Sequence, residues 1–250
     1  MSSFRDIRPP AVNSFSSAPG GERRVRAYEE IKHSLISGRY KPGDDLSVET
    51  IAAELSISRQ PVMEAMRLLS REGFIEIIPQ VGCRVAVHSV GDIGDFFRLF
   101  ATVEGLGASF AAERWENSEL DRLRKVSEAI DSFRSPHFSD RERAEAYRTL
   151  NRAFHGLIAE MARAPMVRQL AHSFWDRSDF HLSASSHYLL FSERLDVAQS
   201  DHEEILAALQ SRDAPAAGKL MSEHILGFRM RLLETLVSPV SAGESGTHSV

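Results

Sequence analysis

The sequence predicts a mainly α-helical protein, with an N-terminal winged helix-turn-helix and a C-terminal antiparallel bundle of about six helices. Three observations support this prediction. A run typical of a DNA-recognition helix begins at Ser58. Two β-prone runs follow it, as a wing requires. After His88 the strand signals end, and apolar residues recur at helical spacing.

The N-terminal segment contains two short helical patterns before the recognition helix. From Tyr28 to Ser37 apolar residues recur at helical spacing, and Gly38 ends the pattern. Ser47 can cap a second short helix that continues to Leu55. A tight turn then leads into the third helix.

The third helix is predicted to begin at Ser58, whose hydroxyl can accept a hydrogen bond from a free backbone N–H. Pro61 is tolerated in the first turn, because no intrahelical bond uses its nitrogen. One face is apolar and is expected to be buried: Val62, Met66 and Leu69. The other face is expected to contact DNA through Arg59, Gln60 and Met63 and, further along, Arg67, which is either at a phosphate or simply exposed. Ser58 and Pro61, at the start of the helix, are also expected at the DNA.

The wing is predicted as a β-hairpin. Its strands are 74–78 and 83–87, and the turn 79–82 joins them. The hairpin tip would touch the DNA backbone or the minor groove. Its expected contacts are Gln80, Gly82 and Arg84.

The second half is predicted to be helical throughout, with short connections typical of an antiparallel bundle. The expected helices are 92–115, 118–133, 140–161, one through Phe174, Trp175 and Phe180, one capped by Ser192 that ends near 211, and one capped by Asp213 that ends at 236. The predicted organisation is an arm at 1–22, the winged head at 23–88, the bundle at 89–237 and a flexible tail at 238–250.

The composition is that of an ordinary globular protein, with 42% hydrophobic and 26% charged residues. No apolar run approaches the roughly 20 residues that span a bilayer, and 1–21 lacks the apolar core of a signal peptide. The single cysteine, Cys83, suits a reducing compartment, so we expect a cytoplasmic protein. The net charge of −5 says little about DNA binding, because affinity depends on basic groups placed at phosphates.

Several segments resemble one known family. The segments 38–46 (GRYKPGDDL), 51–55 (IAAEL) and 58–62 (SRQPV) resemble the DNA-binding head of GntR-family transcriptional regulators. The helical half resembles the C-terminal ligand-sensing (FCD) domain of the FadR-type branch. The matching segments there are 151–155 (NRAFH), 201–209 (DHEEILAAL) and 221–224 (MSEH).

The resemblance implies a transcriptional regulator that binds double-stranded operator DNA as a homodimer. It further implies a repressor whose DNA binding responds to a small carboxylate effector, held at a metal site in the helical domain. It implies no membrane partner and no enzymatic activity.

Two positions depart from the family pattern. Met63 stands where the family usually has an arginine that contacts the operator, and methionine can only pack, for instance against a thymine methyl. Phe100 stands where many members have an arginine for the effector carboxylate. We therefore expect Phe100 in the effector site and Arg177 as a substitute for the missing cation.

A metal site is expected among three histidines on predicted helices. Asn151 and His155 share one helix face at the i, i+4 spacing. The resemblance implies that His202 and His224 meet them in the bundle core. Three imidazoles suit first-row divalent ions, with zinc or nickel our first expectation. Asn151 replaces the family's aspartate, and an amide oxygen is a weaker, neutral donor.

Two alternatives stay open at this point. A three-histidine site with open coordination positions could belong to a metalloenzyme, although the winged head would then be unexplained. The protein could also be a metal-responsive regulator with no organic effector. Three other histidines are expected to be structural or on the surface: His172, His181 and His187.

Overall fold

The computed structural model describes residues 21–135, 137–184 and 195–237. The predictions for the arm at 1–20, the Ser192 cap, His187 and the tail at 238–250 lie outside the described residues.

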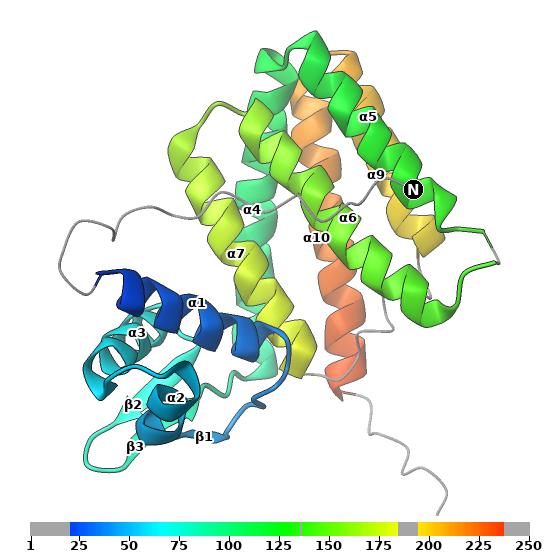
Figure 1. The fold of residues 1–250 in the computed structure, drawn as a ribbon. Coiled ribbons are helices and arrows are strands. Elements are labelled where there is room, and N and C mark those ends of the chain that lie inside the picture. Colours follow the sequence, from blue (N-terminus) through cyan, green and yellow to red (C-terminus); the bar gives the residue numbers. More distant parts are fainter. Residues whose placement is uncertain (1–20, 136, 185–194, 238–250) are drawn as a thin grey trace, which may run out of the picture.

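The N-terminal part is a winged helix-turn-helix, as predicted (Figure 1). Its strands pair antiparallel in the order β1-β3-β2, with Leu46 opposite Cys83 and Ile77 opposite the same residue on the other side. Its elements are α1 (Gly21–Ile36), β1 (Asp45–Leu46), α2 (Val48–Leu55), α3 (Arg59–Arg71), β2 (Ile75–Ile78) and β3 (Gly82–Val85).

Two boundaries of the head differ from the sequence prediction. Helix α1 begins at Gly21, so residues 21 and 22, which we assigned to the arm, are helical. The two-residue strand β1 was not predicted. Its backbone pairs with β3, some 38 residues away in sequence. The residues around β1 therefore carry no local signal from which the strand could be predicted.

The C-terminal part is the predicted helical bundle, with six helices among the described residues. Its core is one continuous apolar cluster that includes Phe97, Leu123, Phe154 and Ile205. The helices are α4 (Val90–Arg114), α5 (Asn117–Ser132), α6 (Asp140–Met161), α7 (Pro165–Ala184), α9 (Leu195–Gln210) and α10 (Ala214–Val237).

Small residues let α4 and α10 pack closely along their length. A Cβ added at Gly105 would meet the Gly218 carbonyl oxygen at 2.7 Å, so any larger residue there would push the helices apart. Ser222 tightens the same contact by donating to the Ala101 carbonyl at 3.0 Å. This close pair forms the wall of the bundle that carries His224.

Two predicted helix caps form and one does not. The Ser47 hydroxyl accepts from the Thr50 N–H at 3.2 Å, and the Asp213 carboxylate accepts from the Ala216 N–H at 3.0 Å. Ser58 does precede α3, but its side chain makes no capping hydrogen bond, so that part of the prediction was wrong.

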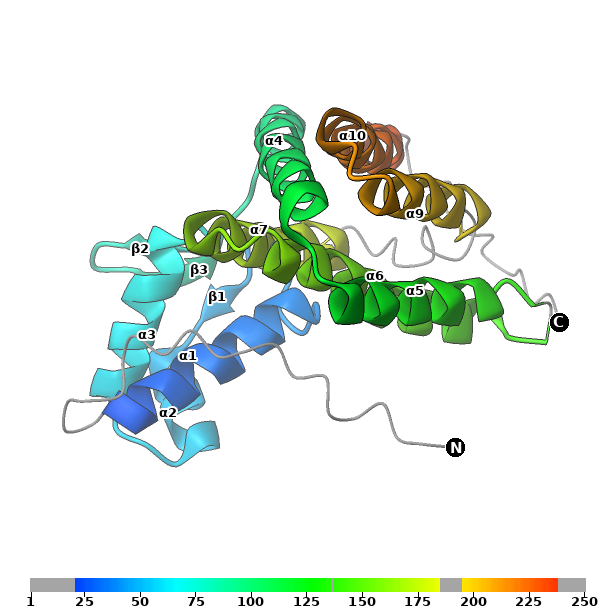
Figure 2. The same ribbon diagram turned by 90° about the horizontal axis from the view of Figure 1, so that it is seen from above.

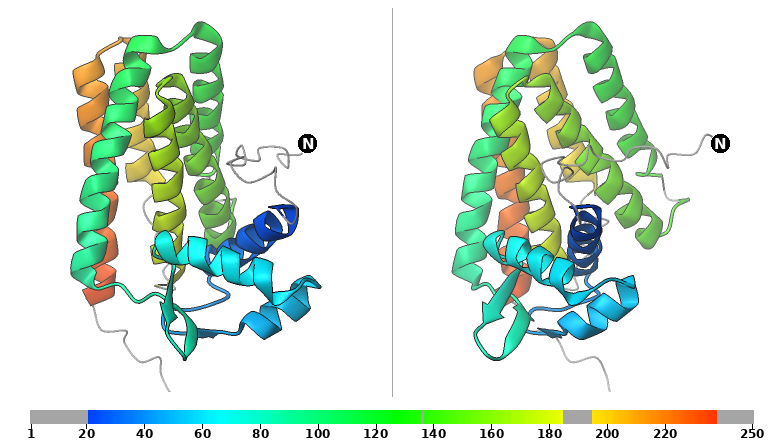
Figure 3. Two further views of the ribbon diagram at one scale, coloured as in Figure 1. Left: turned by 90° about the vertical axis from the view of Figure 1, so that its left-hand side faces the viewer. Right: turned by 60° about the vertical axis from the view of Figure 1, so that its left-hand side comes forward.

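Helix α7 lies between the head and the rest of the bundle (Figure 2). It packs against α4 and α6 on the bundle side and against α1 on the head side. The head sits beside the end of α7 where that helix finishes, as the side views show (Figure 3). None of the helices within the described ranges is long and apolar enough to cross a membrane.

Candidate functional site

Three buried histidines meet at the centre of the bundle. His155 comes from α6, His202 from α9 and His224 from α10, and one nitrogen from each lies within 4.8 Å of the others. All three side chains are nearly inaccessible to solvent. The sequence prediction that these histidines come together is therefore confirmed.

Two carboxylates orient two of the rings from behind. The Glu104 Oε2 atom lies 2.6 Å from His155 Nδ1, and the Asp201 Oδ2 atom lies 3.0 Å from His224 Nδ1. A carboxylate at Nδ1 places the proton on that nitrogen and turns the Nε2 lone pair toward the centre. Such pairing is typical of histidines that bind metals.

The third ring is fixed by packing. His202 stacks on Phe154, with ring centroids 4.3 Å apart, and both of its nitrogens lack a hydrogen-bond partner. Burial and the neighbouring His224 and His155 hold the pKa of His202 well below its usual value. Burial also lowers the pKa of His224, against the opposing effect of its hydrogen bond to Asp201. Both rings are therefore neutral and can donate a lone pair.

The donor set fits a divalent first-row metal ion. Nε2 of His155, both nitrogens of His202 and Oδ1 of Asn151 are buried without partners. Unpaired polar atoms in a protein interior cost about 1–3 kcal/mol each, which a bound ion would offset. Bonds of about 2.1 Å to imidazole nitrogens would hold them at most about 4.2 Å apart, close to the separation seen here.

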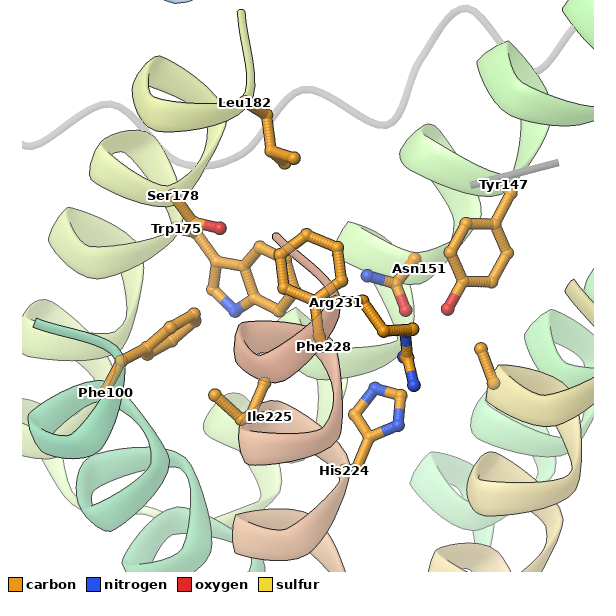
Figure 4. Close-up of a pocket in the computed structure, with 11 residues that line it drawn as sticks. Phe100, Tyr147, Asn151, Trp175, Ser178, Leu182, His224, Ile225, Phe228 and Arg231 are labelled. Atoms are coloured by element: carbon orange, nitrogen blue, oxygen red, sulfur yellow. The ribbon is translucent and has the colours of Figure 1, made fainter. Parts of the chain in front are cut away.

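A pocket opens directly beside the histidines, with an empty volume of about 590 Å³ (Figure 4). It lies between α4, α6, α7, α9 and α10, and a bound metal would face into it through His224. Its lining residues are Phe100, Tyr147, Asn151, Trp175, Ser178, Leu182, Ala198, His224, Ile225, Phe228 and Arg231.

The two expected effector residues have different positions. Phe100 lines the pocket, as expected. Arg177 is not among the lining residues; its guanidinium instead donates to the Glu72 carbonyl in the head. Among the described lining residues, the cation is Arg231 on α10, which we did not single out, because the sequence does not show which face of the last helix turns inward.

Charged side chains join the head to the bundle across α7. Lys32 on α1 lies 2.8 Å from an Asp176 oxygen and 3.1 Å from a Glu72 oxygen, and Asp176 also pairs with Arg152. Arg152 follows Asn151 directly in α6. Burial would lower the pKa of Lys32, but Asp176, Tyr28 and Glu72 raise it above its usual value.

Residue Gly73 lets Arg177 approach the head closely. The backbone there has φ of +74°, and a Cβ would collide with the Arg177 guanidinium. The same guanidinium lies 3.4 Å from His88 Nε2. Any larger residue at position 73 would therefore be strained by the positive φ and would displace the Arg177 guanidinium from the Glu72 carbonyl.

The side chains expected to contact DNA lie on α3 and the wing and are exposed or partly buried. The Arg59 side chain is 71% exposed and pairs with Glu49 at 3.2 Å. Gln60 is exposed on the same helix and donates to Glu64 at 3.3 Å. The expected contacts that are partly buried are Pro61, Met63 and Arg84, and those that are exposed are Ser58, Arg67, Gln80 and Gly82.

The wing is shaped by its turn residues. Gln80 and Gly82 both have positive φ, of 63° and 143°, at the tip between β2 and β3. Arg84 pairs with Asp45 of β1 at 2.8 Å, so its charge is partly occupied within the sheet.

Two family descriptions match the chain. Residues 23–85 match "Bacterial regulatory proteins, gntR family", and residues 95–227 match "FCD domain". These ranges correspond to the winged head and to most of the helical bundle.

Individual proteins show the same likeness over most of their length. The HTH-type transcriptional repressor GlaR of Escherichia coli is 24% identical over 80% of this chain and 90% of its own. The repressor RspR of the same species is 29% identical, over 78% and 81% of the two chains. The solved structure of E. coli McbR/YncC superposes with a TM-score of 0.69 at 21% identity, covering 85% of this chain and 98% of that one.

Proposed function

We propose a function from one premise: the chain belongs to the gntR family of bacterial regulatory proteins and carries an FCD domain. It is therefore a DNA-binding transcriptional regulator and not an enzyme. We propose that it represses transcription, and that a small organic acid bound at a metal in the FCD domain modulates its operator binding.

The winged head supports operator binding through α3 and the wing. Arg59 and Gln60 lie exposed at the N-terminal end of α3, the part of a recognition helix that contacts base edges. Two heads in a dimer would place two such helices in successive major grooves, so we expect a roughly palindromic operator. Exposed leucines at i, i+7 on α4, Leu99 and Leu106, are suited to a contact between two copies.

The buried histidine cluster supports the metal part of the proposal. Three imidazoles and the Asn151 amide leave coordination positions that a carboxylate oxygen could fill, and the pocket begins at this point. The metal, with zinc or nickel our first choice, would supply Lewis acidity and fix one oxygen of the acid. The residues that line the pocket would determine which acids can bind there.

Helix α7 offers a route from the pocket to the head. Trp175, Ser178 and Leu182 line the pocket, while Asp176 and Arg177 bind Lys32 and Glu72 of the head. A ligand that shifts α7 therefore changes the head contacts directly. An effector acts only through a difference in its affinity for the two head arrangements.

The observation that carries this proposal is that the three-histidine cluster opens into a pocket. Helix α7 forms part of the wall of that pocket and also contacts the head. We therefore expect His202→Ala to lose the metal and the response to acid, while the head still binds DNA. Metal content of the purified protein, and operator affinity with and without acid, would measure both effects. His33→Ala is the matched control, because His33 is exposed on α1.

The outcomes separate the alternatives. Full metal occupancy in His202→Ala would contradict the site. Operator binding that responds to metal but to no acid would favour the purely metal-responsive regulator.

A further inference from the structure

We infer that Glu104 is a positioning residue that couples the metal site to α7, because one of its carboxylate oxygens holds His155 and the other holds the Trp175 indole. The inference rests on the proposed function and names the route by which metal occupancy reaches the head. It does not depend on which acid occupies the pocket.

Glu104 joins three helices at one buried carboxylate. The residue lies on α4 and is 5% exposed. Its Oε2 atom lies 2.6 Å from His155 Nδ1 on α6, and its Oε1 atom accepts from Trp175 Nε1 on α7 at 3.2 Å. A carboxylate can accept from both N–H donors at once. Each oxygen is therefore committed to a different helix.

The two donors also contact each other. The His155 ring packs against the Trp175 indole, with ring centroids 4.6 Å apart. Phe100 meets the same indole edge-on, with centroids 5.2 Å apart. The orientation of the His155 ring and the position of the indole therefore depend on each other.

Trp175 stands directly before the two residues of α7 that contact the head. Asp176 lies 2.8 Å from Lys32 of α1, and Arg177 donates to the Glu72 carbonyl. These three consecutive residues span less than one helical turn. A displacement of the indole that carries α7 with it therefore changes both head contacts.

Metal binding would favour one position of α7 through this link. Nε2 of His155 is buried without a partner, and an ion bound there would fix the ring whose Nδ1 faces Glu104. An α7 position that breaks the Trp175 hydrogen bond leaves a buried carboxylate oxygen unpaired, which is costly, and lets Glu104 turn away from His155. The ion therefore binds one α7 position better than another, as any effector of the head must.

A second connection between α6 and α7 has to be separated from this one. Arg152, three residues before His155, pairs with Asp176. Trp175→Phe removes the indole N–H and keeps an aromatic ring, while the Arg152 pair stays in place. The variant therefore tests the Glu104 link alone.

The experiment measures the operator affinity of the full chain, first stripped of metal and then loaded with zinc, with no acid present. We expect zinc to change the wild-type affinity at least about fivefold, and that of Trp175→Phe less than about twofold, with zinc content measured in both. Trp115→Phe is the matched control, because it removes an indole N–H that donates to the Leu209 carbonyl instead, at 2.7 Å.

The fluorescence of Trp175 provides a second readout. The chain has two tryptophans, so Trp115→Phe leaves Trp175 as the only one. Zinc added to this metal-stripped variant should change the Trp175 emission. Glu104→Gln in the same background should remove most of that change at saturating zinc, because glutamine cannot accept from both N–H donors. A direct effect of the ion on the indole would persist in Glu104→Gln.

The results bear on the inference separately from the proposed function. A zinc response in Trp175→Phe as large as in the wild type overturns the inference, and so does an equal loss of response in Trp115→Phe. An emission change that survives Glu104→Gln overturns the role of the carboxylate. The titrations of the wild type and Trp175→Phe decide the inference even if Glu104→Gln does not fold.

If zinc binds and leaves the wild-type operator affinity unchanged, the inference fails while the metal site stands. Failure of zinc to bind at all would instead refute the proposed metal site.

Discussion

Single side chains on α3 determine how the head would recognise DNA. Arg59 is the cation best placed for a base or phosphate, because it begins the helix and is largely exposed. Met63, one turn later, is partly buried and offers no hydrogen-bond donor. Recognition of the operator sequence should therefore depend more heavily on Arg59 than in a head that also has an arginine at the position of Met63.

We expect Arg59→Ala to weaken specific operator binding by about 1–3 kcal/mol, and relaxed preference at one base position would identify a base contact. Gel-shift titrations on the operator and on scrambled DNA, at two salt concentrations, would measure this. Arg122→Ala is the matched control, since that arginine is 61% exposed on α5 in the bundle. If the two variants have the same operator affinity, Arg59 does not contact the DNA.

At this scale the sequence predicted the residue types of the site but not all of their orientations. His155, His202 and His224 were found because each stands in a recognisable segment. Arg231 was missed and Arg177 misplaced, because the inward face of a long amphipathic helix with scattered apolar residues cannot be read from its sequence. The roles of Glu104 and Asp201 as partners of the histidines also depend on contacts between helices far apart in the chain.

Helix α7 is the element that links the two halves of the molecule. Two of its acids, the partly buried Asp176 and the buried Asp179, pair with Arg152 of α6, and Asp176 also pairs with Lys32 of the head. Lys32 and Arg152 lower the pKa of Asp176 despite its burial, so it stays charged. Charge pairs that are largely shielded from solvent are costly to break, because the partner left behind is only partly hydrated.

We expect Lys32→Met to loosen the head while leaving metal and acid binding intact. The variant leaves Glu72 and Asp176 without a shared cation, so the dependence of operator affinity on acid should shrink by several-fold. Limited proteolysis between head and bundle, together with operator titrations with and without a small organic acid, would measure both effects. Lys219→Met serves as the control, since that lysine is 73% exposed on α10, and a double-mutant cycle with Asp176→Asn isolates the pair.

An acid response that is unchanged in Lys32→Met would contradict transmission through this contact. A coupling free energy near zero in the cycle would have the same meaning. In either case the head and the pocket would communicate through another surface.

Among the elements, the long helices were predicted well and the head's short strand was not. Helices α4, α5 and α6 each begin within two residues of the predicted position, because capping residues and apolar periodicity are local signals. Strand β1 consists of two residues that exist as a strand only through β3. The start of α1 was misplaced because Gly20 and Gly21 in sequence favour a flexible segment.

The junction between head and bundle makes the stability of the whole molecule depend on pH. His181 lies buried there beside His88, with ring centroids 5.2 Å apart, and its Nε2 has no partner. Burial, then the nearby charges of His88 and Arg177, lower the pKa of His181 to about 3. The unfolded chain, with a pKa near 6.5 for this group, binds more protons than the folded protein between these values.

We therefore expect the contribution of His181 to stability to be complete above about pH 6.5 and to fall as pH drops below that value. The slope approaches about 1.4 kcal/mol per pH unit. Urea unfolding from pH 5 to 8 should show that His181→Leu loses less stability on acidification than the wild type. The other buried histidines titrate in both proteins, so the difference between the curves isolates His181. Parallel curves would contradict the assignment, and His33→Leu is the exposed control.

The two faces of α7 also separate two kinds of evolutionary change. Trp175 and Ser178 line the pocket, while Asp176 and Arg177, their neighbours in sequence, contact the head. Substitutions on the pocket face, other than at Trp175, can give a descendant of this protein a new inducer without disturbing how binding is transmitted. Substitutions on the other face can change the strength, or even the sign, of the response to the same inducer. Ligand specificity and the direction of the response could thus change independently through substitutions in one helix.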